Sequence, residues 1–130
     1  MNVTGRVVRG LPRVPIRLIG PAGTVYCHAV VDSGFSDQLT ISEALRQQLG
    51  AAASESAEAA FADALPRTLP LARVRVDFGG DAWLQAEALV TGEVVLVGMD
   101  LLHGHRLTVD CTEGGAVTIV PLSQSPEDTP

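Results

Sequence analysis

The sequence predicts an all-β domain with one or two short helices, and three observations support this prediction. Apolar and polar residues alternate along several segments, as they do in strands with one buried face. Turns rich in glycine and proline separate these segments at short intervals, as in antiparallel hairpins. Residues 42–50 carry the start and stop signals of a short helix.

The first predicted hairpin leads into the stretch with the candidate chemistry. Residues 14–19 alternate in polarity, residues 20–23 form a turn, and residues 24–31 return as a strand that ends directly before Asp32. Pro15 has no backbone N–H to donate to a neighbouring strand. It therefore favours an edge position early in the first strand.

The predicted helix follows this hairpin. Ser42 is suited to cap its first turn, Glu43 is favourable near the positive end of the helix dipole, and Gly50 supplies the stop. The apolar residues that share one face are Ile41, Leu45 and Leu49. We expect this face to pack on the sheet.

Two further hairpins are predicted in the second half of the chain. Residues 71–78 alternate cleanly, Gly79 and Gly80 form a turn, and residues 83–90 return as a strand. Residues 106–110 and 116–121 form the last hairpin across a glycine-containing turn.

The tripeptide Asp32-Ser33-Gly34 is the candidate catalytic site. Aspartic peptidases activate a water between two carboxylates that share one proton, so that one acts as base and the other as acid. Gly34 has no Cβ, so the backbone can run close beside the carboxylate and donate its N–H to Asp32, while Ser33 can hydrogen-bond nearby backbone. The triplet alone is also a common turn.

A second motif about sixty residues later strengthens this interpretation. Residues 94–97 are an apolar strand, followed by Gly98, Met99, Asp100 and a helix-like Leu-Leu step. The order of the two motifs resembles the retropepsin-like aspartic peptidases, which include retroviral proteases and small bacterial relatives. The resemblance covers residues 5–120 and is greatest to the bacterial branch, in which Phe follows the motif glycine.

The resemblance implies a closed β-barrel or sandwich that acts as a homodimer. Asp32 is then the catalytic residue, with Ser33 and Gly34 as its scaffold, and each subunit supplies one carboxylate. A chain of 130 residues has room for one such domain, expected at 1–122, with a disordered polar tail at 123–130. The implied reaction is hydrolysis of peptide bonds in an extended peptide or protein substrate, and it requires no cofactor.

The same resemblance assigns the substrate-binding residues. Phe35, Ser36 and Asp37 are expected to wall the site, and a flap hairpin is expected from paired strands at 55–62 and 67–78. The expected flap tip consists of Ala62, Asp63, Ala64 and Leu65. It lacks the glycine common at this turn in the family, and the composition of residues 51–61 is also compatible with a helix.

Other candidate residues have simpler explanations. Asp100 lacks a following Ser/Thr-Gly and is interpreted as the cap of a short helix, not as a second catalytic residue. The retroviral pattern has Arg where Met99 stands. His103 and His105, near Asp110 and Cys111, match no standard zinc spacing, so no metal site is expected.

Composition excludes several classes of function. The formal net charge is −6 and all nine basic residues are Arg, which argues against a nucleic-acid-binding face. No apolar run is long enough to span a membrane, and the first residues lack the apolar region of a signal peptide. Two cysteines, Cys27 and Cys111, are too few for a disulfide framework. We therefore expect a cytoplasmic protein with buried, unreactive thiols.

Two other hypotheses about function are compatible with the sequence. A non-catalytic module could keep the same fold for dimerisation or peptide binding, and it would bind peptides without cleaving them. A small acidic β-barrel could bind a ligand as a monomer, and its size in solution would distinguish it.

Overall fold

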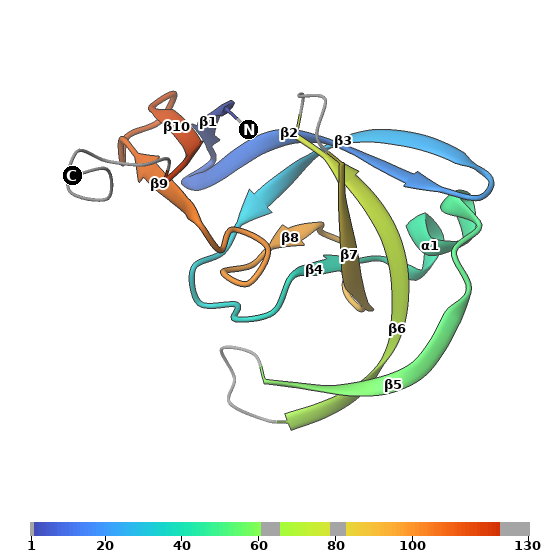
Figure 1. Ribbon diagram of the computed structural model, residues 1–130. Helices are drawn as coiled ribbons and strands as arrows, with labels where there is room; N and C mark the ends of the chain where they lie inside the picture. The colour runs from blue at the N-terminus through green and yellow to red at the C-terminus, as the bar shows by residue number, and fades with distance from the viewer. Residues whose placement is uncertain (1, 61–65, 79–82, 123–130) are drawn as a thin grey trace, which may run out of the picture.

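The computed structural model describes residues 2–60, 66–78 and 83–122. Within these residues, one mixed sheet has the strand order β5-β6-β7-β4-β8-β3-β2-β1-β10-β9, and β6 also pairs with β2. This additional pairing joins strands that are distant in the order, so the middle of the sheet curls back on itself (Figure 1). The strands are β1 (Val3–Val8), β2 (Leu11–Gly20), β3 (Gly23–Val31), β4 (Leu39–Ile41), β5 (Ala53–Ala60), β6 (Pro66–Asp77), β7 (Trp83–Val90), β8 (Leu96–Val97), β9 (His105–Val109) and β10 (Ala116–Pro121).

The predicted hairpins are present. β2 pairs with β3, β6 with β7, and β9 with β10, each antiparallel. The expected flap strands are also paired, with Ala53 opposite Ala72 and Ala60 opposite Pro66. Residues 61–65, 79–82 and 123–130 lie outside the described residues, and with them the predicted flap tip, the predicted turn at Gly79 and Gly80 and the predicted disordered tail.

β2 as a whole is an interior strand between β3 and β1, but Pro15 itself lies at a local edge, as predicted. β1 pairs with β2 only as far as Arg13, and β6 joins β2 from Arg17 onward. Pro15 lies between these two pairings, where β2 has β3 as its neighbour and no second strand requires the missing N–H.

Helix α1 (Glu43–Leu49) has both predicted caps. The Ser42 side chain accepts a 3.1 Å hydrogen bond from the N–H of Leu45, and Gly50 adopts the left-handed conformation with φ 69°. Arg46 pairs with Glu43 on the exposed face, and this ion pair lowers the pKa of the Glu43 carboxyl.

The helix expected after Gly98 is not formed. Residues 99–104 make successive turns, in which the N–H of His103 donates to the Asp100 carbonyl at 3.3 Å. Gly104 then takes φ 82°, and β9 begins at the next residue. The segment is therefore a run of turns and not a helix.

The core is built from the inward-facing residues of the curled sheet. Alternate residues of β2 and β3, such as Val14, Ile16 and Ala29, are buried in one continuous cluster, and Leu49 of α1 joins it. A second, smaller cluster forms around Phe35 and Leu89 beneath the loop between β3 and β4.

The two cysteines are both unpaired and differ in environment. Cys27 is partly buried against the core, and this burial raises the pKa of its thiol. Cys111 is exposed, so the expectation of a buried thiol is wrong for this residue. Within the described ranges, none of the helical structure is long and apolar enough to cross a bilayer.

Candidate active site

Asp32 follows β3 at the point where β3 runs parallel to β8. Val30 lies opposite Leu96, and Val31 lies opposite Val97. The N–H of Asp32 continues this ladder with a 3.0 Å hydrogen bond to the Val97 carbonyl. The two sequence motifs, about sixty residues apart, are therefore held side by side by backbone hydrogen bonds.

The tripeptide forms a tight loop around its own carboxylate. The N–H of Gly34 donates to Oδ1 of Asp32 at 2.9 Å, and the N–H of Phe35 donates to the Asp32 carbonyl at 3.1 Å. A Cβ on residue 34 would lie 3.3 Å from Oδ1 of Asp32, closer than nearly all Cβ contacts. Asp32 is half-buried, whereas Ser33 and Gly34 are exposed. The loop thus orients the carboxylate and presents it at the surface.

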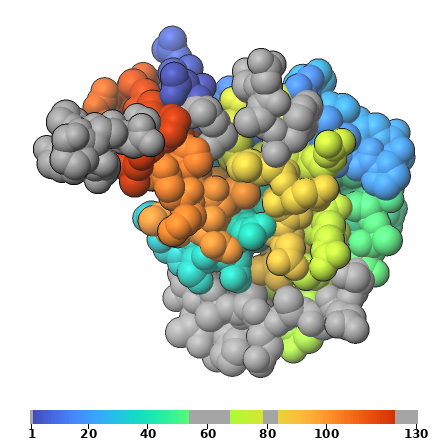
Figure 2. Space-filling view, in the orientation of Figure 1, coloured from blue at the N-terminus to red at the C-terminus, as the bar shows by residue number. Residues whose placement is uncertain are grey.

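Gly98 connects the second motif to this loop. Its N–H donates to the Gln38 carbonyl at 2.9 Å, and the next N–H, of Met99, donates to the Phe35 carbonyl at 2.8 Å. A Cβ on Gly98 would lie 2.1 Å from the Asp37 carbonyl oxygen. Only glycine permits this approach. Figure 2 shows the two segments, teal and orange, in contact on one face of the molecule.

Thr40 is a supporting residue that the sequence analysis did not single out. It is 1% exposed, and its hydroxyl donates to the Val94 carbonyl and accepts from the N–H of Leu96, each at 3.0 Å. These bonds fix β8 beside β4 just before Gly98. The sequence signal for this role was a threonine between Leu39 and Ile41 in an otherwise apolar run, because a buried hydroxyl requires hydrogen-bond partners.

Gln38 is a second supporting residue for which the sequence predicted no role. Its side-chain oxygen accepts from the N–H of Glu87 at 2.8 Å, and its side-chain nitrogen lies 3.3 Å from a carboxylate oxygen of Asp100. The N–H of Asp100 also donates to the Asp37 carbonyl at 3.2 Å. Asp100 therefore braces the loop before β4 and does not cap a helix.

The three residues expected to wall the site differ in exposure. Ser36 is exposed and Asp37 is half-buried. Phe35 is 2% exposed and packs with Leu89 against partly buried residues of the flap strand β6, Leu69 and Leu71. Its side chain thus lies beneath the loop and supports it from inside. The expected tip residues 62–65 lie outside the described residues.

An apolar hollow of about 420 Å³ opens beside Ser33. Its walls include Val7 and Pro12 on one side and Leu107 and Val109 of β9 on the other. Two exposed apolar residues, Val8 (41%) and Leu11 (43%), flank the β1–β2 turn next to it.

No grouping of three potential metal ligands occurs among the described residues. His103 and His105, for which no metal site was expected, make a local contact with each other. Nδ1 of His105 lies 3.1 Å from the His103 carbonyl oxygen.

No protein-family model and no curated protein matches the chain. Among solved structures, the chain is similar to the crystal structure of a retropepsin-like aspartic protease from Rickettsia conorii, at 16% sequence identity with a TM-score of 0.57. The match covers 91% of this chain and 90% of that chain. The chain has a retropepsin-like fold.

The match confirms the mostly β, retropepsin-like fold that the resemblance implied, whereas the closed barrel and the homodimer stay predictions. At this identity the similarity establishes the fold, and the assignment of an activity depends on the geometry around Asp32. One chain contributes a single oriented carboxylate at the surface, supported by Gly34 and by the segment around Gly98.

Proposed function

We propose that the chain is a homodimeric aspartic endopeptidase in which Asp32 of each subunit holds the attacking water. The observation that carries this proposal is the 2.9 Å hydrogen bond from the Gly34 N–H to Asp32, in a loop anchored to β8 of a retropepsin-like fold. Such an oriented carboxylate at the end of a buried strand is what water activation requires.

The reaction needs two carboxylates in different protonation states. The ionised Asp32 removes a proton from the water, whose oxygen attacks the carbonyl carbon of the scissile bond. The protonated Asp32 of the partner subunit donates to the carbonyl oxygen. Collapse of the tetrahedral intermediate breaks the C–N bond, and the leaving amine takes a proton from a carboxyl group. Ser33 and Gly34 act as the scaffold of this pair.

The apolar surface next to Asp32 supports a dimer. The hollow beside Ser33 and the exposed Leu11 leave apolar area uncovered close to the proposed site, which supports a two-fold contact there. A second copy of the chain both covers this area and completes the carboxylate pair.

The flap strands indicate how substrate is held. β5 and β6 form a long curved hairpin (Figure 1), and Leu69 and Leu71 of β6 pack near Phe35 under the catalytic loop. An extended peptide is proposed to lie between this hairpin and the loop, with main-chain hydrogen bonds to Ser36, Asp37 and the tip residues Ala62, Asp63, Ala64 and Leu65.

The test is cleavage of a peptide library by the wild type, by Asp32→Asn and by Glu43→Gln. Asp32→Asn keeps the shape of the side chain and removes the base, so turnover should fall by about 10³-fold or more. Glu43 is exposed on α1 and does not line the hollow beside Ser33, so Glu43→Gln should keep wild-type turnover. A statine-type inhibitor should block the activity, and sedimentation should show a dimer for every variant.

Four results would contradict the proposal. Hydrolysis retained by purified Asp32→Asn would remove Asp32 from the mechanism. Peptide binding without cleavage by the wild type would favour the non-catalytic module, whereas a monomer that binds a ligand would favour the small β-barrel. A rate that keeps rising above pH 8 would indicate a different base, since a carboxylate pair is active only with one proton between its members.

A further inference from the structure

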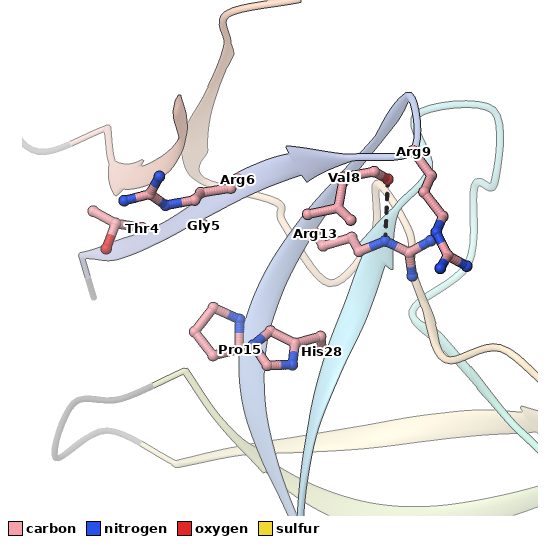
Figure 3. A pocket seen from close by; sticks show the side chains of 8 residues that line it. All are labelled: Thr4, Gly5, Arg6, Val8, Arg9, Arg13, Pro15 and His28. Atoms are coloured by element: carbon pink, nitrogen blue, oxygen red, sulfur yellow. Dashed lines mark hydrogen bonds between the residues drawn. The ribbon is translucent and has the colours of Figure 1, made fainter. Parts of the chain in front are cut away.

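A second hollow, of about 610 Å³, lies on the outer face of β1, β2 and β3 (Figure 3). The residues of interest on its lining are Thr4, Arg6, Arg9, Arg13, Pro15 and His28. We call it the arginine hollow. Its volume is in the range of small-molecule binding sites.

Strand alternation explains which side chains face the arginine hollow. Val14 and Ile16 of β2 and Ala29 of β3 point into the core, so Arg13, Pro15 and His28 point outward. The hollow exists because β1 leaves β2 beyond the Arg6–Arg13 pair, so no strand covers β2 at Pro15.

Two of the arginines are direct cross-strand neighbours. Arg6 of β1 is the antiparallel partner of Arg13 of β2, so both side chains start from the same face of the sheet. Like charges in this relationship destabilise a sheet. A third arginine, Arg9, follows in the turn with φ 56°, and Gly10 then has φ 76°.

No carboxylate of the described residues forms an ion pair with the side chain of Arg6, Arg9 or Arg13. Within the described part of the chain, the ion pairs are Arg17 with Asp77 and Arg46 with Glu43. Glu113 lies at the Arg9 end of the cluster, where its carboxylate accepts the backbone N–H groups of Arg9 (2.9 Å) and Gly10 (3.2 Å) and so holds the turn.

The positive groups lie at both ends of the hollow. In Figure 3, Arg6 extends toward Thr4, whereas Arg9 and Arg13 extend from the other side of Val8. Nε of Arg13 donates to the Val8 carbonyl at 3.3 Å, which leaves its terminal nitrogens available. This arrangement matches a ligand with at least two anionic groups, each able to accept from a guanidinium.

We propose that the arginine hollow binds a small oligoanion that carries phosphate or carboxylate groups. The chain as a whole has a net charge of −6, so its overall field repels anions and the attraction must be local. Three of the nine arginines gathered on one face supply that local field. The proposal does not depend on peptidase activity.

Calorimetric titration of the full chain at constant ionic strength tests this inference, with inorganic tripolyphosphate, citrate and orthophosphate as probes. We expect tripolyphosphate or citrate to bind, and orthophosphate to bind more weakly than either. Binding of tripolyphosphate alone assigns phosphate chemistry, and binding of citrate alone assigns carboxylate chemistry. The Asp32→Asn variant should bind as the wild type does, which separates this site from the proposed active site.

Matched variants locate the binding. Arg6→Gln and Arg13→Gln should each weaken it about threefold to fivefold, the effect typical of an exposed ion pair. Arg106→Gln, which removes an exposed arginine of β9 outside the hollow, should leave it unchanged. Without ligand and at low salt, Arg6→Gln should unfold at the same or a higher temperature, because it removes the cross-strand repulsion. Absence of binding by both oligoanions, or equal weakening in Arg6→Gln and Arg106→Gln, would overturn the proposal.

Discussion

The backbone N–H of Gly34 donates a 2.9 Å hydrogen bond to Oδ1 of Asp32, two residues earlier in the chain. The bond closes the loop Asp32-Ser33-Gly34 on itself, so the orientation of the carboxylate is set by three consecutive residues. The β3–β8 ladder then sets the position of that loop through the Asp32 N–H. Contacts within the tripeptide set the orientation of the carboxylate. The pairing of two distant strands sets its position.

Gly34→Ala should lower turnover more than stability. The new Cβ would lie 3.3 Å from Oδ1 of Asp32, so the carboxylate must move by a few tenths of an ångström. We expect kcat to fall about tenfold, since catalysis is sensitive to small displacements of the reacting group. The free energy of unfolding should change by less than about 1 kcal/mol because residue 34 is exposed. Unchanged kcat in a folded dimer would show that the carboxylate tolerates this displacement.

Gly98→Ala should lower stability more than turnover. Its Cβ would lie 2.1 Å from the Asp37 carbonyl oxygen and 2.6 Å from a ring carbon of Phe35, and backbone cannot move aside as a flexible side chain does. We expect the free energy of unfolding to fall by about 2–4 kcal/mol. Urea denaturation of both glycine variants measures the contrast. Equal stability of the two would show that the segment after β8 relaxes without cost.

Thr40→Val should destabilise the fold although it preserves shape. The substitution removes the partner of the Val94 carbonyl and of the Leu96 N–H, each in a part-buried hydrogen bond. A loss of about 2–4 kcal/mol is expected for two such groups. Thr40→Ser retains the hydroxyl and should lose only about 1 kcal/mol from the missing methyl group. If the serine variant were the less stable of the two, packing and not hydrogen bonding would be the main role of Thr40.

The Glu43–Arg46 pair should add stability only above acidic pH. The guanidinium lowers the pKa of the Glu43 carboxyl from its ordinary value of 4.5. Because this pKa is lower in the folded chain than in the unfolded chain, the contribution is complete above the unfolded value and is lost as pH falls through the folded value. Thermal unfolding of the wild type and Glu43→Gln should therefore differ at pH 7 and converge near pH 3. Arg46 is a poorer site for this test, since it also donates to the Ala51 carbonyl at 2.7 Å.

Features that depend on neighbours along the chain could be predicted from the sequence. The caps of α1 were predictable because Ser42 and Gly50 act within one helical turn. The bond between Gly34 and Asp32 was predictable for the same reason, since it spans two residues. The hairpins followed from alternation and turn residues, and their partners are close in sequence.

Tertiary structure alone decided the relationships between distant segments. The parallel pairing of β3 with β8, the need for glycine at 98 beside the Asp37 carbonyl, and the two bonds of the Thr40 hydroxyl all join segments more than fifty residues apart. The burial of Phe35 and the helix that failed to form after Gly98 follow from the same contacts. Local pattern does not specify which strands meet, because each strand offers the same backbone donors and acceptors to every partner. Burial of apolar side chains in a common core determines which strands pair.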